Sequence, residues 1–247
     1  MKKLILVFSV IMEFFLFSCK KENRNDCFTS RGETVAEIRD LNVFRHIKLG
    51  KRIKLVLIED TVNYAEVEAG SHLLVSIITK VEGDSLIIEN QNKCNWVRTY
   101  KDSIYIKLHY TNLYSIEMNG ASSITNVDTL RNSDTLRLEF RDASGDVNLT
   151  VKNKQIDIIQ HTGASDVTIK GKTDDLSVYM SGLGWGDYSR LFCRTVYVDT
   201  RSSADVKVYA TLAFNFRLRF SGDIYYRGAG TVNSTTIIGD GKIVKLP

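Results

Sequence analysis

HTGASDV (residues 161–167) is one of five related turns in the second half of this 247-residue chain. The others read RDASGDV (141–147), MSGLGWGDY (180–188), TRSSADV (200–206) and FSGDIYY (220–226), and NGASSI (119–124) is a weaker first copy. Each turn brings small residues to an aspartate, and a β-branched or aromatic residue follows. Glycine adopts positive φ without steric cost, and Ser or Asp side chains bond local backbone amides. Each copy is therefore first of all a corner of the fold.

The aspartates that close these turns recur at nearly constant spacing. They are Asp146, Asp166, Asp187, Asp205 and Asp223, with steps of 20, 21, 18 and 18 residues. A sequence period of roughly twenty residues indicates a repeat architecture rather than an ordinary globular fold.

Every turn lies between short runs in which apolar and polar residues alternate. Before the turns these are LRLEF (136–140), IDIIQ (156–160), LSVYM (176–180), VYVDT (196–200) and FRLRF (216–220). After three of them come VNLTV (147–151), VTIKG (167–171) and VKVYA (206–210). Such alternation predicts strands with one buried face. Two strands and two turns make one coil of a β-solenoid, and coils must stack, about 4.8 Å apart, to bury their inward faces.

We therefore predict that residues 136–226 form successive coils of one parallel β-helix. The residue at the centre of each pre-turn strand should point into the interior. The predicted interior column is Leu138, Ile158, Val178, Val198 and Leu218.

The first half of the chain also reads as strands, but less regularly. Alternating runs occupy residues 44–50, 51–59, 64–70, 85–90, 103–110 and 113–118, and the β-branched segment 73–81 favours strand over helix. No linker separates the halves, so we expect one all-β domain over residues 40–247 with irregular N-terminal coils.

The N-terminus carries an export signal. Residues 1–18 contain two lysines followed by an apolar stretch too short to span a bilayer, and Leu16-Phe17-Ser18-Cys19 resembles the lipobox of bacterial lipoproteins. That resemblance implies cleavage before Cys19 and lipidation of its thiol, which would anchor the chain to a membrane. The alternative is an ordinary secretory signal. Residues 19–39 are polar and read as a tether. We expect an outer-membrane lipoprotein, and leave its surface or periplasmic orientation open.

The same chain resembles a known family. The features that carry the likeness are the opening Phe44 to Ile47, the strand at 64–67, the LL-then-IxTxV pattern at 73–81, the serial turns, and the closing segment DIYYRG (223–228). They are similar to the head GIN domain family, described as auto-transporter adhesins and often lipoproteins of the Bacteroidetes. The resemblance implies a right-handed, single-stranded β-helix and a non-enzymatic adhesive role. It brings no residue-level function with it.

Composition excludes several classes of protein. The formal net charge is only +4, and no basic cluster interleaved with aromatics marks a nucleic-acid site. Besides Cys19 the chain has Cys27, Cys94 and Cys193, without zinc spacing. A Cys27–Cys94 disulfide and three free thiols both stay open. We expect no cofactor, since GLGWGD lacks the Lys-Ser/Thr ending of a phosphate loop.

The repeat aspartates allow three interpretations. Stacked in register, their carboxylates would form a ladder whose like charges repel, or share a cation such as calcium. Two close carboxylates could also serve a glycosidase or lyase, as in some parallel β-helix enzymes. The third interpretation, which we favour, is structural: each carboxylate accepts amide hydrogen bonds within its own corner.

Trp185 is the best candidate for contact with a partner. It lies between two glycines in the one turn that is longer than its neighbours, and an aromatic ring on a protruding turn can stack on a sugar face or a protein. We expect Tyr188 and Tyr179 on the same side, together with Tyr225 and Tyr226. The alternative is that Trp185 folds back to cover adjacent turns.

Three functions follow from this sequence. A lipid-anchored, non-enzymatic envelope or surface protein that binds a glycan or protein ligand is the leading hypothesis. A purely structural envelope lipoprotein and a carbohydrate-active enzyme of the parallel β-helix type are the alternatives. Catalytic residues, metal ligands and nucleic-acid contacts are not predicted, and the oligomeric state is left open.

Overall fold

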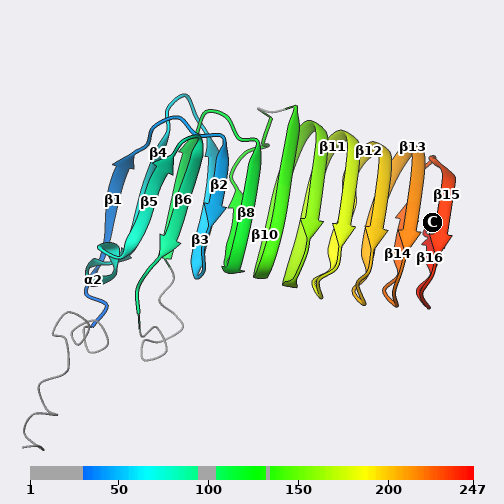
Figure 1. Ribbon diagram of the computed structural model, residues 1–247. Helices are drawn as coiled ribbons and strands as arrows, with labels where there is room; N and C mark the ends of the chain where they lie inside the picture. The colour runs from blue at the N-terminus through cyan, green and yellow to red at the C-terminus, as the bar shows by residue number, and fades with distance from the viewer. Residues whose placement is uncertain (1–29, 94–103, 132–133) are drawn as a thin grey trace, which may run out of the picture.

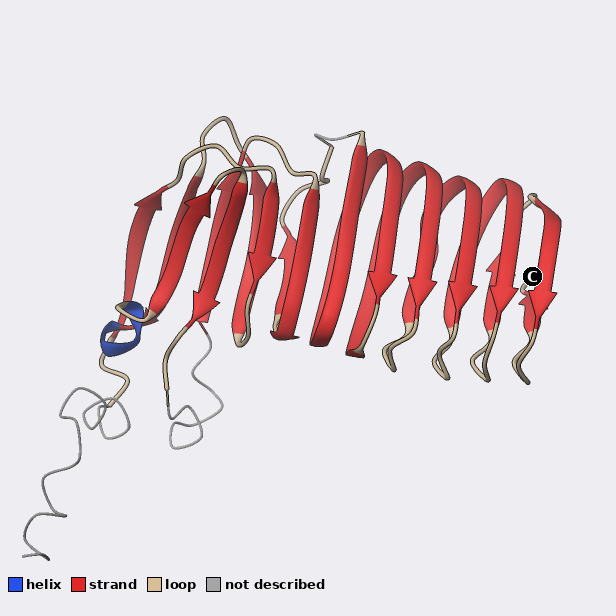
Figure 2. Ribbon diagram, in the orientation of Figure 1, coloured by secondary structure: helices blue, strands red, loops and turns tan. Residues whose placement is uncertain are grey.

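The computed structural model describes residues 30–93, 104–131 and 134–247. Their one helix is the single turn α2 (Ser71–Leu74), and the rest is strand, turn and loop (Figure 2). No helix within these ranges has the length and apolar character needed to cross a membrane. The expected signal peptide, Cys19, Cys27 and Cys94 lie outside the described residues.

The N-terminal half forms two walls of strands. One wall has the order β5–β6–β2–β8, and the other β1–β4–β7–β3–β9. β1, β4 and β7 pair antiparallel, as do β5 and β6, which accounts for the irregular sequence pattern there. The bounds are β1 Thr34–Asp40, β2 His46–Leu49, β3 Ile53–Glu59, β4 Tyr64–Gly70, β5 Ile77–Glu82, β6 Ser85–Asn90, β7 Ile104–Tyr110, β8 Ser115–Ala121 and β9 Ser123–Asn126.

Two details of this half differ from expectation. The strands begin at Thr34, within the segment expected to be a tether, because β1 pairs along its whole length with β4. The segment 73–81, read as strand, starts as the helical turn α2 with Leu73 and Leu74 buried, and only then becomes β5.

Both walls continue into regular coils (Figure 1). Every pairing from β10 onward is parallel, and the turns of successive coils line up along one edge (Figure 2). The predicted β-solenoid is thus confirmed. The bounds are β10 Thr135–Gln160, β11 Gly163–Met180, β12 Gly186–Thr200, β13 Val206–Leu218, β14 Ile224–Arg227, β15 Thr231–Ile237 and β16 Ile243–Lys245.

The predicted interior column is correct except at its end. Ile158 pairs with Val178, and Val178 with Val198, all fully or almost fully buried. Val198, however, pairs with Phe216, whereas Leu218 pairs with Thr200. The assignment of Leu218 was wrong because the coil from β12 to β13 is two residues shorter than the two coils before it along this wall.

Residues with positive φ angles occur in the aspartate-containing turns of the first regular coils. Gly163 has φ +97°, and a Cβ there would lie 2.0 Å from the carbonyl oxygen of Ala143 on the preceding coil. Asp142 also lies in the left-handed region, at φ 46°. Its backbone N–H donates to Thr162 Oγ1 (2.8 Å), which in turn donates to the Asp142 carboxylate (2.9 Å). Stacking of coils thus requires glycine at one position and a cross-coil hydrogen bond at another.

The described cysteine is part of the core. Cys193 is buried and free, and burial raises the pKa of its thiol to about 12. A thiol in this setting is protonated at neutral pH and is a packing residue.

Candidate functional site

The aspartates of the repeated turns come together along one edge, with one substitution in the row. Asp146 pairs with Asp166. The next residue in this row is Trp185, whose backbone N–H donates to Asp166 Oδ1 (3.1 Å). The following coils contribute Asp205 and Asp223, as the pairings Gly186 with Val206 and Val206 with Ile224 require. An exposed aromatic ring therefore stands where the repeat otherwise places a carboxylate.

Three of the four carboxylates in this row bond the next coil, rather than their own corner as expected from the sequence. Asp166 accepts from the N–H of Trp185, Asp205 Oδ1 from the N–H of Asp223 (2.9 Å), and Asp223 Oδ1 from the N–H of Lys242 (2.7 Å). Each of these carboxylates thus accepts a hydrogen bond from a turn N–H group that has no carbonyl partner on the neighbouring strand in the described part of the chain. Within the described ranges, no three His, Cys, Asp or Glu residues are grouped so as to hold a metal ion.

Asp187 lies outside this row. It pairs with Thr168 on one side and Lys207 on the other, two residues further along the coil than Asp166 and Asp205. The register between β11 and β12 shifts by one residue directly after Asp187, which is a β-bulge. Asp187 Oδ1 accepts from the N–H of Ser189 (3.0 Å) and so caps the bulge within its own turn.

Tyr188 is in the interior and does not reach the surface. Its side chain is fully buried and occupies space next to Gly186, where other coils place a valine or isoleucine. The hydroxyl has no hydrogen-bond partner among the described residues, and burial raises the pKa of this phenol far above its ordinary value. Tyr188 is thus a core residue, in place of the partner contact expected from the sequence.

The other expected tyrosines lie on strands β11 and β14 rather than in the turn that holds Trp185. Tyr179 is half-buried on the pre-turn wall, where it pairs with Ile159 and has its ring 6.2 Å from that of His161. Tyr225 donates from its hydroxyl to Asp223 Oδ2 (3.1 Å), a bond that raises the pKa of the phenol. Of the five aromatic residues expected at this turn edge, Trp185 is therefore the one that is exposed.

Trp185 lines a surface depression between two successive turns. Its side chain is 42 % exposed, and the depression has a volume of about 460 Å³. Asp187 and Asp205 supply carboxylates, and Lys207 and Ser203 supply an ammonium and a hydroxyl. Because one oxygen of each carboxylate already bonds a backbone N–H, the other stays available to an external donor. The complete lining is Trp185, Gly186, Asp187, Ser203, Ala204, Asp205 and Lys207.

Sequence reasoning did not single out Ser203 and Lys207. Both are exposed polar residues of a kind found on any strand or turn, and only the pairing of Asp187 with Lys207 brings the lysine beside Trp185. That pairing follows from the cross-coil register of Gly186 with Val206, which no local sequence signal reveals.

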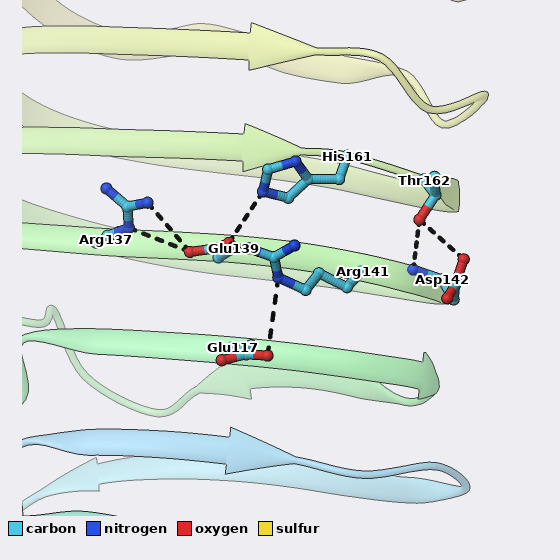
Figure 3. A network of polar contacts seen from close by, with 7 residues as sticks. All are labelled: Glu117, Arg137, Glu139, Arg141, Asp142, His161 and Thr162. Atoms are coloured by element: carbon cyan, nitrogen blue, oxygen red, sulfur yellow. Dashed lines mark hydrogen bonds and ion pairs between the residues drawn. The ribbon is translucent and has the colours of Figure 1, made fainter.

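The pre-turn wall carries a separate charged network (Figure 3). Glu139 accepts hydrogen bonds from Arg137 Nη2 (3.1 Å) and His161 Nε2 (2.9 Å), and also pairs with Arg141. Arg141 in turn reaches Glu117 on β8 (3.9 Å). Burial alone would raise the pKa of the Glu139 carboxyl, but its hydrogen bonds to His161 and Arg137 and the nearby cations outweigh it and lower that pKa.

This network joins three successive coils across the start of the regular solenoid. Each of its arginines pairs with a carboxylate. We read it as a structural contact between coils.

A family model described as "Putative auto-transporter adhesin, head GIN domain" matches residues 43–230. The chain belongs to the head GIN domain family. The match spans the N-terminal walls and the coils that form the depression, so the candidate site lies within the family's fold. The resemblance drawn from the sequence is thereby confirmed.

Solved structures similar to this head GIN chain share its fold. A putative adhesin from Bacteroides fragilis has a TM-score of 0.78 at 19% identity, over 87% of this chain and 97% of that one. A putative lipid binding protein from Parabacteroides distasonis has a TM-score of 0.61 at 17% identity, over 87% and 98%. A putative adhesin from the same species has a TM-score of 0.55 at 18% identity, over 87% and 98%. No curated protein matches the chain.

Proposed function

We propose that this protein is a lipid-anchored, non-enzymatic binding module of the cell envelope, and that it adheres to a glycan through the depression at Trp185. The observation that carries the proposal is the placement of Trp185 in the aspartate row, exposed and flanked by free carboxylate oxygens. An aromatic face packs against the C–H face of a sugar ring, while carboxylates accept hydrogen bonds from its hydroxyls.

The family name supports an adhesive rather than an enzymatic role. The depression gives the enzyme alternative no support, since Asp187 and Asp205 each hold a backbone amide with one carboxylate oxygen. A glycosidase would need one of these carboxyl groups to deliver a proton to the leaving oxygen, whereas the proposed role uses both as hydrogen-bond acceptors.

A glycan array probed with the purified protein tests the binding function. Wild type should bind a defined set of glycans, and Trp185→Ala should lose that binding. Leu183→Ala is the matched control, because Leu183 is an exposed apolar side chain (71 %) of the same turn. Equal binding by wild type and Trp185→Ala would contradict the proposal, as would a protein that retains no glycan.

The anchor has its own test. Cys19→Ser should abolish incorporation of a labelled fatty acid and leave an uncut precursor. Equal labelling of the variant and wild type would contradict lipidation at Cys19, while leaving the Trp185 site untouched.

A further inference from the structure

A second depression lies on the outer face of the post-turn wall. It has a volume of about 300 Å³ and spans β9, β10, β11 and the start of β12. Thr150, Lys170 and Arg190 occupy equivalent positions on three successive coils, so the two cations stand side by side. Asn148 and Thr168 form the neighbouring outward row and add an amide and a hydroxyl. We call this the Lys170–Arg190 groove.

The groove has a fixed end. Asn126 accepts from the N–H of Thr150 (2.9 Å) and donates to the carbonyl oxygen of Thr150 (2.8 Å). This pair of hydrogen bonds ties the Asn126 side chain to the next coil and shapes one wall of the groove. The groove is therefore formed by strands and cross-coil bonds, without movable loops.

The charged residues that line the groove are both basic. None of its lining residues is acidic, and within the described ranges neither Lys170 nor Arg190 makes an ion pair. On the pre-turn wall the opposite holds: Arg137 pairs with Glu139, and Arg219 with Asp199 (2.7 Å). Two adjacent cations without a protein carboxylate, beside an amide and hydroxyls, present the donor set that a bound anion requires.

The groove is continuous with the depression at Trp185. Thr168 lines the groove, Asp187 lines the depression, and the two residues pair directly across neighbouring strands. A single extended ligand can therefore contact both. An oligosaccharide of several rings can place one sugar on Trp185 and an acidic substituent in the groove.

We propose that the Lys170–Arg190 groove is an anion subsite and that the ligand is an acidic glycan, carrying carboxylate, sulfate or phosphate groups. The inference rests on the proposed glycan-binding function and names its substrate class. The Arg190 guanidinium offers two parallel N–H donors to one acidic group, and the Lys170 ammonium adds a second charge-assisted bond. Trp185 then stacks on a neighbouring sugar ring of the same chain.

The test compares three polymers of matched length by calorimetry with the purified full-length chain: sulfated dextran, polygalacturonate and uncharged dextran. Wild type should bind at least one charged polymer about tenfold or more tightly than dextran, since each charge-assisted hydrogen bond lost costs at least that factor. Lys170→Gln/Arg190→Gln should remove this preference. Tighter binding of sulfated dextran would identify sulfate as the preferred acidic group, and tighter binding of polygalacturonate would identify carboxylate.

The matched control is Arg194→Gln/Arg201→Gln, which removes two exposed charges from the same part of the chain outside the groove. It should keep the preference, and an equal loss in both double variants would overturn the proposal by showing diffuse attraction. A preference that survives Lys170→Gln/Arg190→Gln, or no polymer bound by wild type, would overturn it too. So would binding to phosphatidylglycerol vesicles in place of both charged polymers.

Trp185→Ala separates this inference from the function on which it rests. If the variant weakens all binding while Lys170→Gln/Arg190→Gln removes only the charge preference, both stand. If the charge preference depends on Lys170 and Arg190 but Trp185→Ala has no effect, the anion subsite stands and the role of Trp185 fails.

Discussion

The ring of Tyr188 fills the interior space beside Gly186, where a Cβ would lie only 2.7 Å from Cε2 of that ring. Elsewhere in the same row the solenoid uses Val147, Val167 and Val206 to fill this space. This coil uses Gly186 and Tyr188 where the neighbouring coils use a single valine. The same coil places Trp185, exposed, in the aspartate row and has a bulge directly after Asp187. Core packing and the candidate site are thus coupled at this coil.

This coupling predicts opposite effects of two substitutions. Gly186→Val should lower the free energy of unfolding by about 2–3 kcal/mol, because the added methyl groups collide with the Tyr188 ring. Tyr188→Phe should raise it by about 1 kcal/mol, because the buried hydroxyl has no partner. Urea denaturation measures both, and a stable Gly186→Val protein would show that Tyr188 lies elsewhere.

The coil register predicts a large penalty at Val178. Val178→Asp would bury a charge without a partner and should cost about 4 kcal/mol or more. Ser177→Lys, which adds a charge one residue away on the outward face beside Asp157, is the control and should change stability little. Thermal melts that show similar losses for both variants would contradict the register.

The sequence predicted the coils better than it predicted their alignment. Period-two alternation and the twenty-residue period depend on burial of one strand face, which every copy must satisfy, so Ile158, Val178 and Val198 were placed correctly. The shorter coil before Phe216 and the register around the Trp185 turn change which residues pair across coils. Those shifts moved Leu218, Asp187 and Tyr188 from their expected positions.

The candidate site was predicted in part for the same reason. Trp185 stands out in sequence because it interrupts a glycine-rich turn. Lys207, Lys170 and Arg190 are ordinary exposed residues of alternating strands, and only cross-coil register gathers them. Their contribution could not be inferred from neighbours in sequence.

The aspartate row predicts a structural effect that is independent of calcium. Asp205→Ala should destabilise the fold by about 1 kcal/mol, because the N–H of Asp223 loses its acceptor. Asp146→Ala is the control, since the Asp146 carboxylate accepts no backbone hydrogen bond in the described part of the chain. Were a cation shared instead, stability would rise by about 2.7 kcal/mol at a hundredfold excess of calcium over its dissociation constant. Melts in chelator and in calcium should coincide.

Glu139 predicts a specific pH dependence. Its carboxyl has a lowered pKa in the folded protein, so its ion pairs stabilise the fold above the unfolded pKa of about 4.3. That contribution is lost as pH falls through the folded pKa. Glu139→Gln should therefore be less stable than wild type at neutral pH, and the difference should shrink in acid. A difference in unfolding free energy that stays constant from pH 7 to pH 3 would contradict the role of the network.

The most direct test of the central claim uses Trp185 itself as the probe. The chain has two tryptophans, so Trp96→Phe leaves Trp185 as its single indole emitter. Titration of this variant with a glycan retained on the array should change the Trp185 emission saturably, with the midpoint found by calorimetry, because a sugar stacked on the ring removes it from water. Calorimetric binding of the same glycan with unchanged Trp185 emission would contradict the claim that the ligand lies in the Trp185 depression.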